Sequence, residues 1–209
     1  MIVGDNEAEH TFYVHEEVAA EFSDFLKAAI QGGFSEAQDR IVRLPDDDPE
    51  LFKIFLAFTY TGRVYCTKAD DRESPNEDRE KGRLADAWMM AERLQSVKFK
   101  DAIVDSLIAN MLSTGTYPTG TYKGIYAESA GPSGMRKLHV DIAVFSWSNK
   151  DLEDADRDEA WQDFFYDVAV RSQAFGIAGR PRQEPWKEAS WCRYHDHGDA
   201  APCYKSMFA

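Results

Sequence analysis

The fold is decided by one stretch near the start of the chain, HTFYVHEEVAAEFSDFLKAAIQGGF, which covers residues 10–34. Residues 11–14 carry β-branched and aromatic side chains, which are typical of a β-strand. From Glu16 onward the apolar side chains recur at helical spacing, and Ser23 is placed to cap a second helix after a break. The stretch therefore predicts a strand that leads directly into two short helices, with His15 at the junction.

Two more strands and a buried helix are expected around this stretch. Residues 1–4 are a candidate hairpin partner of the first strand, and residues 41–44 predict a strand that stops at Pro45. Asp48 is a good N-cap, with proline at the first helical position after it. The helix that follows ends at Gly62 and is expected to be mostly buried because of its apolar residues. Those residues are Leu51, Phe52, Ile54, Phe55 and Phe58. A further short strand is predicted at Val64 and Tyr65.

The middle of the chain predicts a charged loop followed by a helical hairpin. Residues 67–82 are charged and lack an apolar period, which favours a solvated loop or a frayed helix start. Apolar residues at helical spacing then predict helices around residues 84–94 and 99–111. Residues 114–134 are rich in Gly, Thr, Tyr and Pro, so we expect a loop or short irregular strand there, and a domain boundary.

The C-terminal part predicts two more helices and an irregular tail. In residues 135–147 a strand period and a helix period compete, and a helix with Ser133 as its cap is favoured. Residues 159–174 predict an amphipathic helix, with Trp161, Phe164 and Phe165 among the residues of its apolar side. An acidic loop is expected before it, over residues 150–158.

Composition and charge exclude several classes of partner. The chain has 209 residues, 44% of them hydrophobic, and a formal net charge of −13. This charge repels phosphate backbones and anionic lipids, so we expect neither nucleic-acid nor membrane partners. The first residues lack the pattern of a secretory signal, and no stretch approaches the roughly 20 apolar residues of a membrane span. We expect a soluble globular protein in the cytosol or nucleus.

Six short motifs follow one another along the first half of the chain. They are Phe12-x-Val14-His15, Val18-x-Ala20, Ser23-x-Phe25-Leu26, Val42-x-Leu44-Pro45-x-Asp47-Asp48-Pro49-x-x-Phe52, Tyr60-Thr61-Gly62, and Leu84-Ala85-x-Ala87-Trp88 with Leu94-Gln95. No single motif is specific, but together, in this order, they resemble a BTB (POZ) domain of the divergent kind common in filamentous fungi. The resemblance marks these as fold-signature residues: His15, Ser23, Asp48, Phe52, Tyr60 and Gly62.

The resemblance implies an α+β fold in which a short sheet is flanked by helical hairpins. It covers about residues 1–112, and it begins inside the first hairpin, as if the N-terminus of the family domain were incomplete. A loop or linker over 113–134, a mainly helical extension over 135–175 and an irregular tail over 176–209 are expected to follow.

The resemblance also implies a role. Known BTB domains are interaction modules, so we expect a non-enzymatic scaffold or adaptor whose partners are other proteins. A narrower alternative is a substrate adaptor of a cullin-3 ubiquitin ligase, as some BTB proteins are. The N-terminal helix and strand that many dimeric members exchange do not precede the match, which argues against swapped dimerisation and leaves homodimerisation open.

His15 has a catalytic and a structural interpretation. A catalytic histidine needs a nucleophile or carboxylate partner, and the adjacent Glu16 and Glu17 should point into solvent. The favoured interpretation is structural, with the imidazole satisfying loose backbone groups where the strand becomes a helix. Tyr60 is likewise interpreted as a buried aromatic residue before the helix-ending Gly62, rather than as part of an anion-binding turn.

The tail contains a cluster of metal-ligand residue types, Cys192, His195, His197 and Cys203. Two thiolates and two neutral imidazoles make a tetrahedral zinc site without net charge, although the spacing is not that of a standard zinc finger. A structural zinc and no metal role are therefore both open. A more distant alternative is a metal-dependent hydrolase with Asp196 or Asp199 as its base. Otherwise we expect neither a catalytic residue nor a cofactor.

Overall fold

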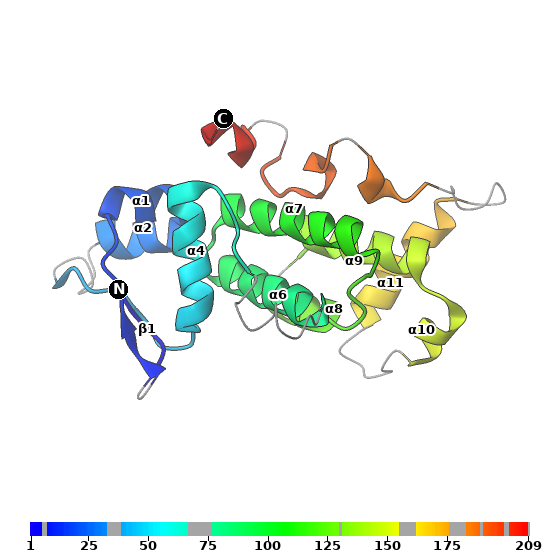
Figure 1. Cartoon of the computed structure of the whole chain (residues 1–209), viewed down its shortest axis with the longest axis horizontal. Coiled ribbons are helices and arrows are strands. Elements are labelled where there is room, and N and C mark those ends of the chain that lie inside the picture. The colour runs from blue at the N-terminus through cyan, green and yellow to red at the C-terminus, as the bar shows by residue number, and fades with distance from the viewer. Residues whose placement is uncertain are drawn as a thin grey trace.

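The computed structural model shows a small sheet and a pair of short helices at one end of a helical body (Figure 1). It describes residues 1–5, 8–32, 39–66, 77–129, 131–154, 162–175, 183–188, 190–198 and 201–208. The long helices α6 and α7 lie side by side in the middle, and the C-terminal tail runs along α7 (Figure 1). The fold is the expected α+β type with a mainly helical C-terminal part. Within these residues, no helix is long and apolar enough to cross a lipid bilayer.

Three short strands form one sheet among the described residues, in the order β2-β1-β3. β1 (Ile2–Val3) pairs antiparallel with β2 (His10–Thr11) and parallel with β3 (Arg43–Leu44). The expected hairpin is therefore confirmed, but its second strand ends at Thr11 instead of continuing to Val14. The predicted strand at Val64 and Tyr65 is wrong, because neither residue belongs to the sheet.

Ser23 separates the first two helices, α1 (Glu16–Phe22) and α2 (Asp24–Gln31). Its hydroxyl accepts a hydrogen bond from the Leu26 amide at 3.0 Å and donates one to the Leu94 carbonyl at 2.6 Å. The predicted N-cap is thus confirmed. The same hydroxyl also connects the start of α2 to the residue that follows α6.

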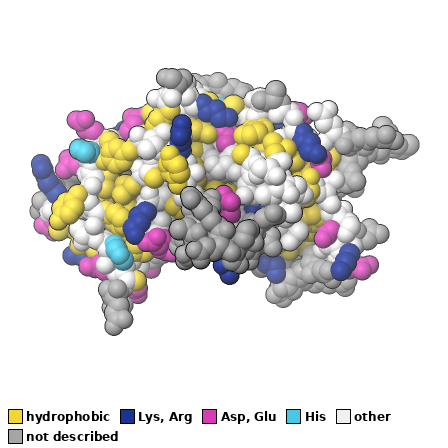
Figure 2. Space-filling model, in the orientation of Figure 1, with side chains coloured by type: hydrophobic (Ala, Val, Ile, Leu, Met, Phe, Trp, Pro, Cys, Tyr) yellow, Lys and Arg dark blue, Asp and Glu magenta, His cyan; other side chains and the backbone are white. Residues whose placement is uncertain are grey.

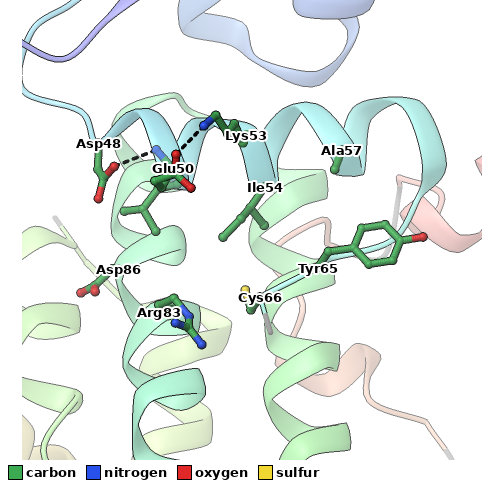
Figure 3. A pocket seen from close by; sticks show the side chains of 10 residues that line it. Asp48, Glu50, Lys53, Ile54, Ala57, Tyr65, Cys66, Arg83 and Asp86 are labelled. Carbon is green, nitrogen blue, oxygen red and sulfur yellow. Dashed lines mark hydrogen bonds and ion pairs between the residues drawn. The ribbon is translucent and has the colours of Figure 1, made fainter. Parts of the chain in front are cut away.

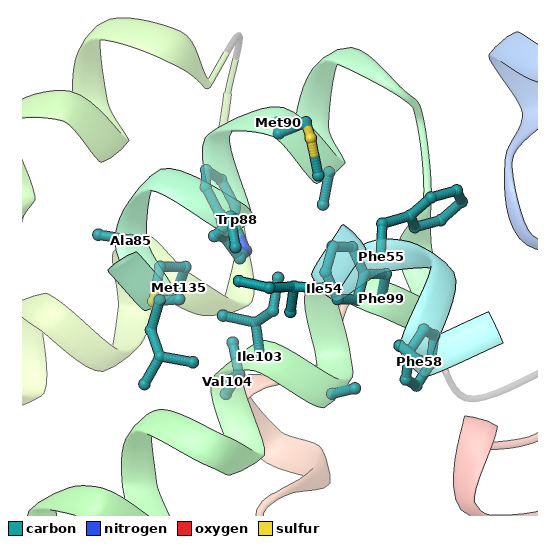
Figure 4. Packing of buried hydrophobic residues seen from close by; sticks show 14 of the residues in the cluster. Ile54, Phe55, Phe58, Ala85, Trp88, Met90, Phe99, Ile103, Val104 and Met135 are labelled. Carbon is teal, nitrogen blue, oxygen red and sulfur yellow. The ribbon is translucent and has the colours of Figure 1, made fainter. Parts of the chain in front are cut away.

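The next helix, α4 (Pro49–Thr61), begins and ends as its sequence predicts. Asp48 Oδ1 accepts from the Glu50 amide at 2.7 Å, and Gly62 ends the helix in the left-handed conformation. Phe52, Phe55 and Phe58 are fully buried. The ring centroid of Phe99 of α7 lies 5.4 Å from that of Phe55 and 5.2 Å from that of Phe58, and Figure 4 shows these side chains in the buried cluster with Ile54 and Ile103. The fold-signature residue Phe52 is therefore a core residue.

The helical hairpin consists of α6 (Glu77–Arg93) and α7 (Val97–Thr114). Of residues 67–82, residues 77–82 form the first turns of α6, which agrees with the helix start rather than the loop expected there; residues 67–76 lie outside the described part of the chain. Glu, Lys and Arg have high helix propensity, so a charged segment can be helical without an apolar period. Trp88 of α6 is fully buried against α7 (Figure 4).

Four C-terminal helices follow among the described residues. They are α8 (Tyr122–Glu128), α9 (Gly134–Ser146), α10 (Asn149–Asp154) and α11 (Gln162–Gln173). Of these, α8 packs on α6 and α9 on α7, while α11 packs on α8 and α9. The predicted irregular loop over 114–134 is wrong for α8, whose buried residues Tyr122, Ile125 and Tyr126 have helical spacing. The predicted acidic loop is helical over α10. Residues 155–161, which include Trp161, lie outside the described part. The helix favoured for α9 is confirmed.

One hydrophobic core connects the two halves of the chain. Met135, Leu138 and Ile142 of α9 belong to the same buried cluster as the aromatic residues of α4 and α7. A second cluster lies between α8, α9 and α11, where the rings of Tyr122 and Phe164 stack with centroids 4.3 Å apart. The extension therefore packs against the first half.

The tail contributes three short 3₁₀ helices, η4 (Pro185–Lys187), η5 (Cys192–Tyr194) and η6 (Tyr204–Met207). Trp186 and Tyr194 are fully buried, and Tyr204 is nearly so. The ring of Phe208 lies 5.9 Å from that of Phe58 and 6.0 Å from that of Phe22, between centroids. The tail is thus part of the folded body.

Substitutions at Gly62 and Gly115 test whether Phe208 contacts the end of α4. Both glycines end a helix with φ of 71°, but a Cβ at Gly62 would overlap the ring of Phe208, whereas one at Gly115 would meet open space. Gly115→Ala should cost only the left-handed strain, about 1–2 kcal/mol of unfolding free energy. Gly62→Ala should cost more, because it also displaces Phe208.

In a Phe208→Ala background the two glycine substitutions should become equally costly, as judged by urea unfolding. Equal costs already in the wild-type background would contradict the contact between Phe208 and Gly62.

Candidate functional site

The four candidate metal ligands of the tail come together in space. One ligand atom from each of Cys192, His195, His197 and Cys203 lies within 4.8 Å of all the others. Cys192 begins η5, His195 directly follows it, and Cys203 directly precedes η6. The structure therefore gathers the whole set that the sequence suggested, from two turns and the segment between them.

The local backbone explains how two histidines separated by one residue can share a site. His195 is extended, with φ −93° and ψ 153°, and alternate side chains of an extended segment point to the same side. The two rings lie 5.4 Å apart between centroids. Gly198 then takes a φ of +66°, which turns the chain back toward Cys203.

Each imidazole has one nitrogen bonded away from the cluster and one directed into it. His195 Nε2 lies 3.0 Å from Asp105 Oδ1, while its Nδ1 lies 3.6 Å from Cys203 Sγ. His197 Nδ1 lies 2.5 Å from the Gly198 carbonyl oxygen. Its Nε2 is buried without a hydrogen bond of good geometry. The inward nitrogens are thus His195 Nδ1 and His197 Nε2.

The two thiols differ in their electrostatic surroundings. Interaction with the adjacent His197 imidazole holds the pKa of Cys192 below its ordinary value, and the same interaction raises the pKa of His197. Burial raises the pKa of Cys203. The third cysteine, Cys66, is buried in the core, where burial raises its pKa to about 12.

Two buried carboxylates of α7, those of Asp101 and Asp105, accept hydrogen bonds from the tail. Asp105 accepts hydrogen bonds from the Tyr204 hydroxyl at 2.6 Å and from Lys205 Nζ at 2.8 Å, besides its contact with His195. Burial alone would raise the pKa of Asp105, but these donors outweigh burial and lower it. Asp101 Oδ1 accepts from the Asp196 amide at 2.6 Å, and burial raises the Asp101 pKa to about 6.

Sequence reasoning missed Asp101 and Asp105. The signal that could have found them is their spacing of four residues within an apolar helical period, which places two charged groups on a face expected to be buried. Such a pair requires donors from elsewhere in the chain. The tail provides those donors.

Asp196, one candidate base, has structural partners. Its Oδ1 accepts from the Gly134 amide at 2.6 Å, and its Oδ2 lies 3.0 Å from Lys100 Nζ. Both bonds connect the tail to the body of the protein, because Gly134 begins α9 and Lys100 belongs to α7. The other candidate, Asp199, lies outside the described part of the chain.

A second carboxylate network joins the tail to the extension. Asp141 of α9 is fully buried; its Oδ1 accepts from Arg171 Nε at 2.6 Å and its Oδ2 from the Tyr194 hydroxyl at 2.7 Å. The two donors offset the cost of burying this carboxylate, so its role is structural rather than catalytic. It therefore serves to fix α9, α11 and η5 to one another.

His15 does not satisfy backbone groups as expected. It occupies the N-cap position of α1, but its side chain makes no capping hydrogen bond there. Instead, its Nδ1 lies 2.8 Å from the hydroxyl of Tyr60, whose ring meets the imidazole edge-on. Tyr60 is also not the buried residue expected, because its side chain is exposed at the end of α4. Both residues therefore belong to the surface.

A groove of about 310 Å³ lies between α4 and α6 (Figure 3). Ile54 and Ala57 of α4 and Cys66 form its apolar part, while Arg83 and Asp86 of α6 lie across from them (Figure 3). Burial and the nearby Asp48 carboxylate raise the pKa of Asp86. The groove combines an apolar floor with charged side chains at its margin, as protein-contact surfaces often do.

Comparison with known proteins agrees with this architecture. A profile of the BTB/POZ domain matches residues 1–110, which is just over half of the chain and includes the sheet, α1, α2, α4, α6 and most of α7. None of the curated proteins matches the sequence. The extent of the profile match shows that this chain belongs to the BTB/POZ domain family.

Proposed function

We propose that this protein is a non-enzymatic scaffold or adaptor that binds another protein through its BTB domain. BTB domains are protein-interaction modules, which supports this role in general terms. The observation that carries the specific proposal is a group of exposed aromatic side chains within the matched region. We call Tyr13, His15 and Tyr60 the aromatic surface.

The aromatic surface arises because successive side chains of an extended segment point to opposite sides. Phe12 and Val14 pack against the core, so Tyr13 and His15, on the other side of the same segment, face outward. The side chain of Tyr13 is 96% exposed and that of Tyr60 is 49% exposed. Figure 2 shows hydrophobic side chains gathered over α4 and the N-terminal elements on this face.

Exposed tyrosines of this kind suit protein recognition. Tyrosine provides a large, rigid contact area at low entropic cost and is enriched among the residues that contribute most to binding energy. The hydrogen bond between His15 and Tyr60 restrains two of the three rings before any partner binds. The surface is therefore partly preorganised.

The first test uses a Tyr13→Ser/Tyr60→Ser double variant in proximity labelling from living cells. Its control is Tyr166→Ser, which removes a tyrosine that is 70% exposed on α11, outside the matched region. Proteins enriched by the wild type should be lost with the double variant and kept with the control. For a purified partner, affinity should fall about 30-fold, corresponding to about 2 kcal/mol.

The melting temperature of the double variant should stay close to that of the wild type, since the lost atoms are exposed. If no enriched protein depended on the two tyrosines, or if Tyr166→Ser had the same effect, the proposed surface would be incorrect. Sedimentation velocity of the same variants tests whether the partner is a second copy of this chain.

The narrower proposal, a substrate adaptor of a cullin-3 ubiquitin ligase, calls for a direct titration. Calorimetry of the full chain with the N-terminal region of cullin-3 should give a Kd below about 10 μM, which is a binding free energy of about −7 kcal/mol. The Tyr166→Ser control should bind equally well. Absence of binding at that concentration would leave only the broader interaction role.

A further inference from the structure

We propose that Cys192, His195, His197 and Cys203 bind one Zn²⁺ ion, and that this ion holds the C-terminal tail against α7. This site is separate from the aromatic surface and does not depend on the proposed protein-binding function. Residues 191–204 contribute all four ligands, so the site belongs to the tail rather than to the matched BTB region.

The spacing of the ligand atoms fits a tetrahedral zinc site. Zn–S bonds of about 2.3 Å and Zn–N bonds of about 2.0–2.1 Å place neighbouring ligand atoms about 3.3–3.8 Å apart. The separation of 3.6 Å between Cys203 Sγ and His195 Nδ1 already lies in this range. The widest separation in the set, 4.8 Å, exceeds it by about 1 Å, which small side-chain rotations can remove.

The hydrogen bonds of the two histidines leave the correct nitrogens for a metal. His197 Nδ1 donates to the Gly198 carbonyl, which leaves the lone pair of the buried Nε2 directed into the cluster. His195 Nε2 donates to Asp105, which leaves the lone pair of Nδ1 facing Cys203. A buried ring nitrogen without a good hydrogen bond is costly in itself, and a metal bond would remove that cost.

Asp105 completes the arrangement that metal-bound histidines usually have. Such a histidine donates its second N–H to a carboxylate or carbonyl, which fixes the ring and increases its basicity. Asp105 provides this bond to His195 and is itself fixed by Tyr204 and Lys205. Asp105 is therefore a positioning residue for the zinc site.

The ligand set indicates a structural rather than a catalytic ion. Two thiolates and two imidazoles neutralise Zn²⁺ and occupy all four tetrahedral positions, so no position remains for a reactive water molecule. The bonded partners of Asp196 agree with this, since they connect the tail to α7 and α9. The geometry thus favours structural zinc over the metal-dependent hydrolase.

The ion would connect the two turns of the tail that contact the body of the protein. η5 carries the buried Tyr194, and η6 carries Tyr204 and leads to Phe208 against Phe58. Between them the chain reverses at Gly198. Closing this loop with a metal lowers the entropy that the tail gains on detachment.

The first test measures metal in protein purified without a His tag. Elemental analysis of the wild type should give close to one zinc ion per chain, and Cys192→Ser/Cys203→Ser should retain less than about a tenth of it. The matched control is Cys66→Ala, which removes the core thiol and should keep its zinc. Zinc below a tenth of an equivalent in the reduced wild type would overturn the proposal.

Cobalt gives a readout that folding alone cannot produce. Co²⁺ added to metal-free wild type should show the intense absorption of a tetrahedral thiolate site, and Zn²⁺ should abolish it. His197→Gln should weaken Zn²⁺ affinity at least about tenfold, as measured by competition with a chromophoric chelator. A Cys192–Cys203 disulfide in the freshly purified protein, with no cobalt signal after reduction, would also overturn the proposal.

The anchoring role is tested by limited trypsin digestion of the full chain. Removing zinc should speed cleavage after Arg193 and Lys205 at least about tenfold, because cleavage follows local opening of the tail. Cleavage after Lys53 in α4 serves as the internal control and should not change. Equal cleavage of the tail with and without zinc would show that the ion does not hold it.

Discussion

Two buried carboxylates on α7, those of Asp101 and Asp105, require hydrogen-bond donors, and the C-terminal tail supplies them. A carboxylate without partners in the interior costs several kcal/mol, so a tail that covers these two groups must also bring donors to them. The Asp196 amide, the Tyr204 hydroxyl and Lys205 all serve this requirement. The position of the Cys/His cluster follows from it, because its residues lie on the segment that these bonds hold in place.

The second constraint is the shared core. α9 contributes Met135, Leu138 and Ile142 to the cluster that also contains the aromatic residues of α4 and α7. Trp186 and Tyr194 of the tail extend the same cluster. The chain therefore combines a BTB domain with additions that complete its core on one side, while the aromatic surface remains exposed on another.

Local signals in the sequence predicted much of the first half. Ser23, Asp48 and Gly62 act at helix ends through their own hydrogen bonds or backbone conformation, so short-range chemistry was enough to place them. α8 was missed because its Gly- and Thr-rich surroundings resemble a loop and its helix depends on tertiary burial. The contact between His15 and Tyr60 spans 45 residues and has no local signal. The Cys/His cluster was visible as residue types, whereas its carboxylate partners on α7 depend on long-range packing.

The shared core extends beyond the part of the chain that matches the BTB/POZ family. The BTB/POZ profile ends at residue 110, within α7, whereas the buried cluster continues through α9 and into the tail. A fragment cut at the family boundary would present the α7 face, with its two carboxylates and apolar neighbours, to water. In this protein the segment that matches the BTB/POZ family is therefore shorter than the segment that shares one hydrophobic core. The residues after position 110 cover the BTB domain from within the same chain.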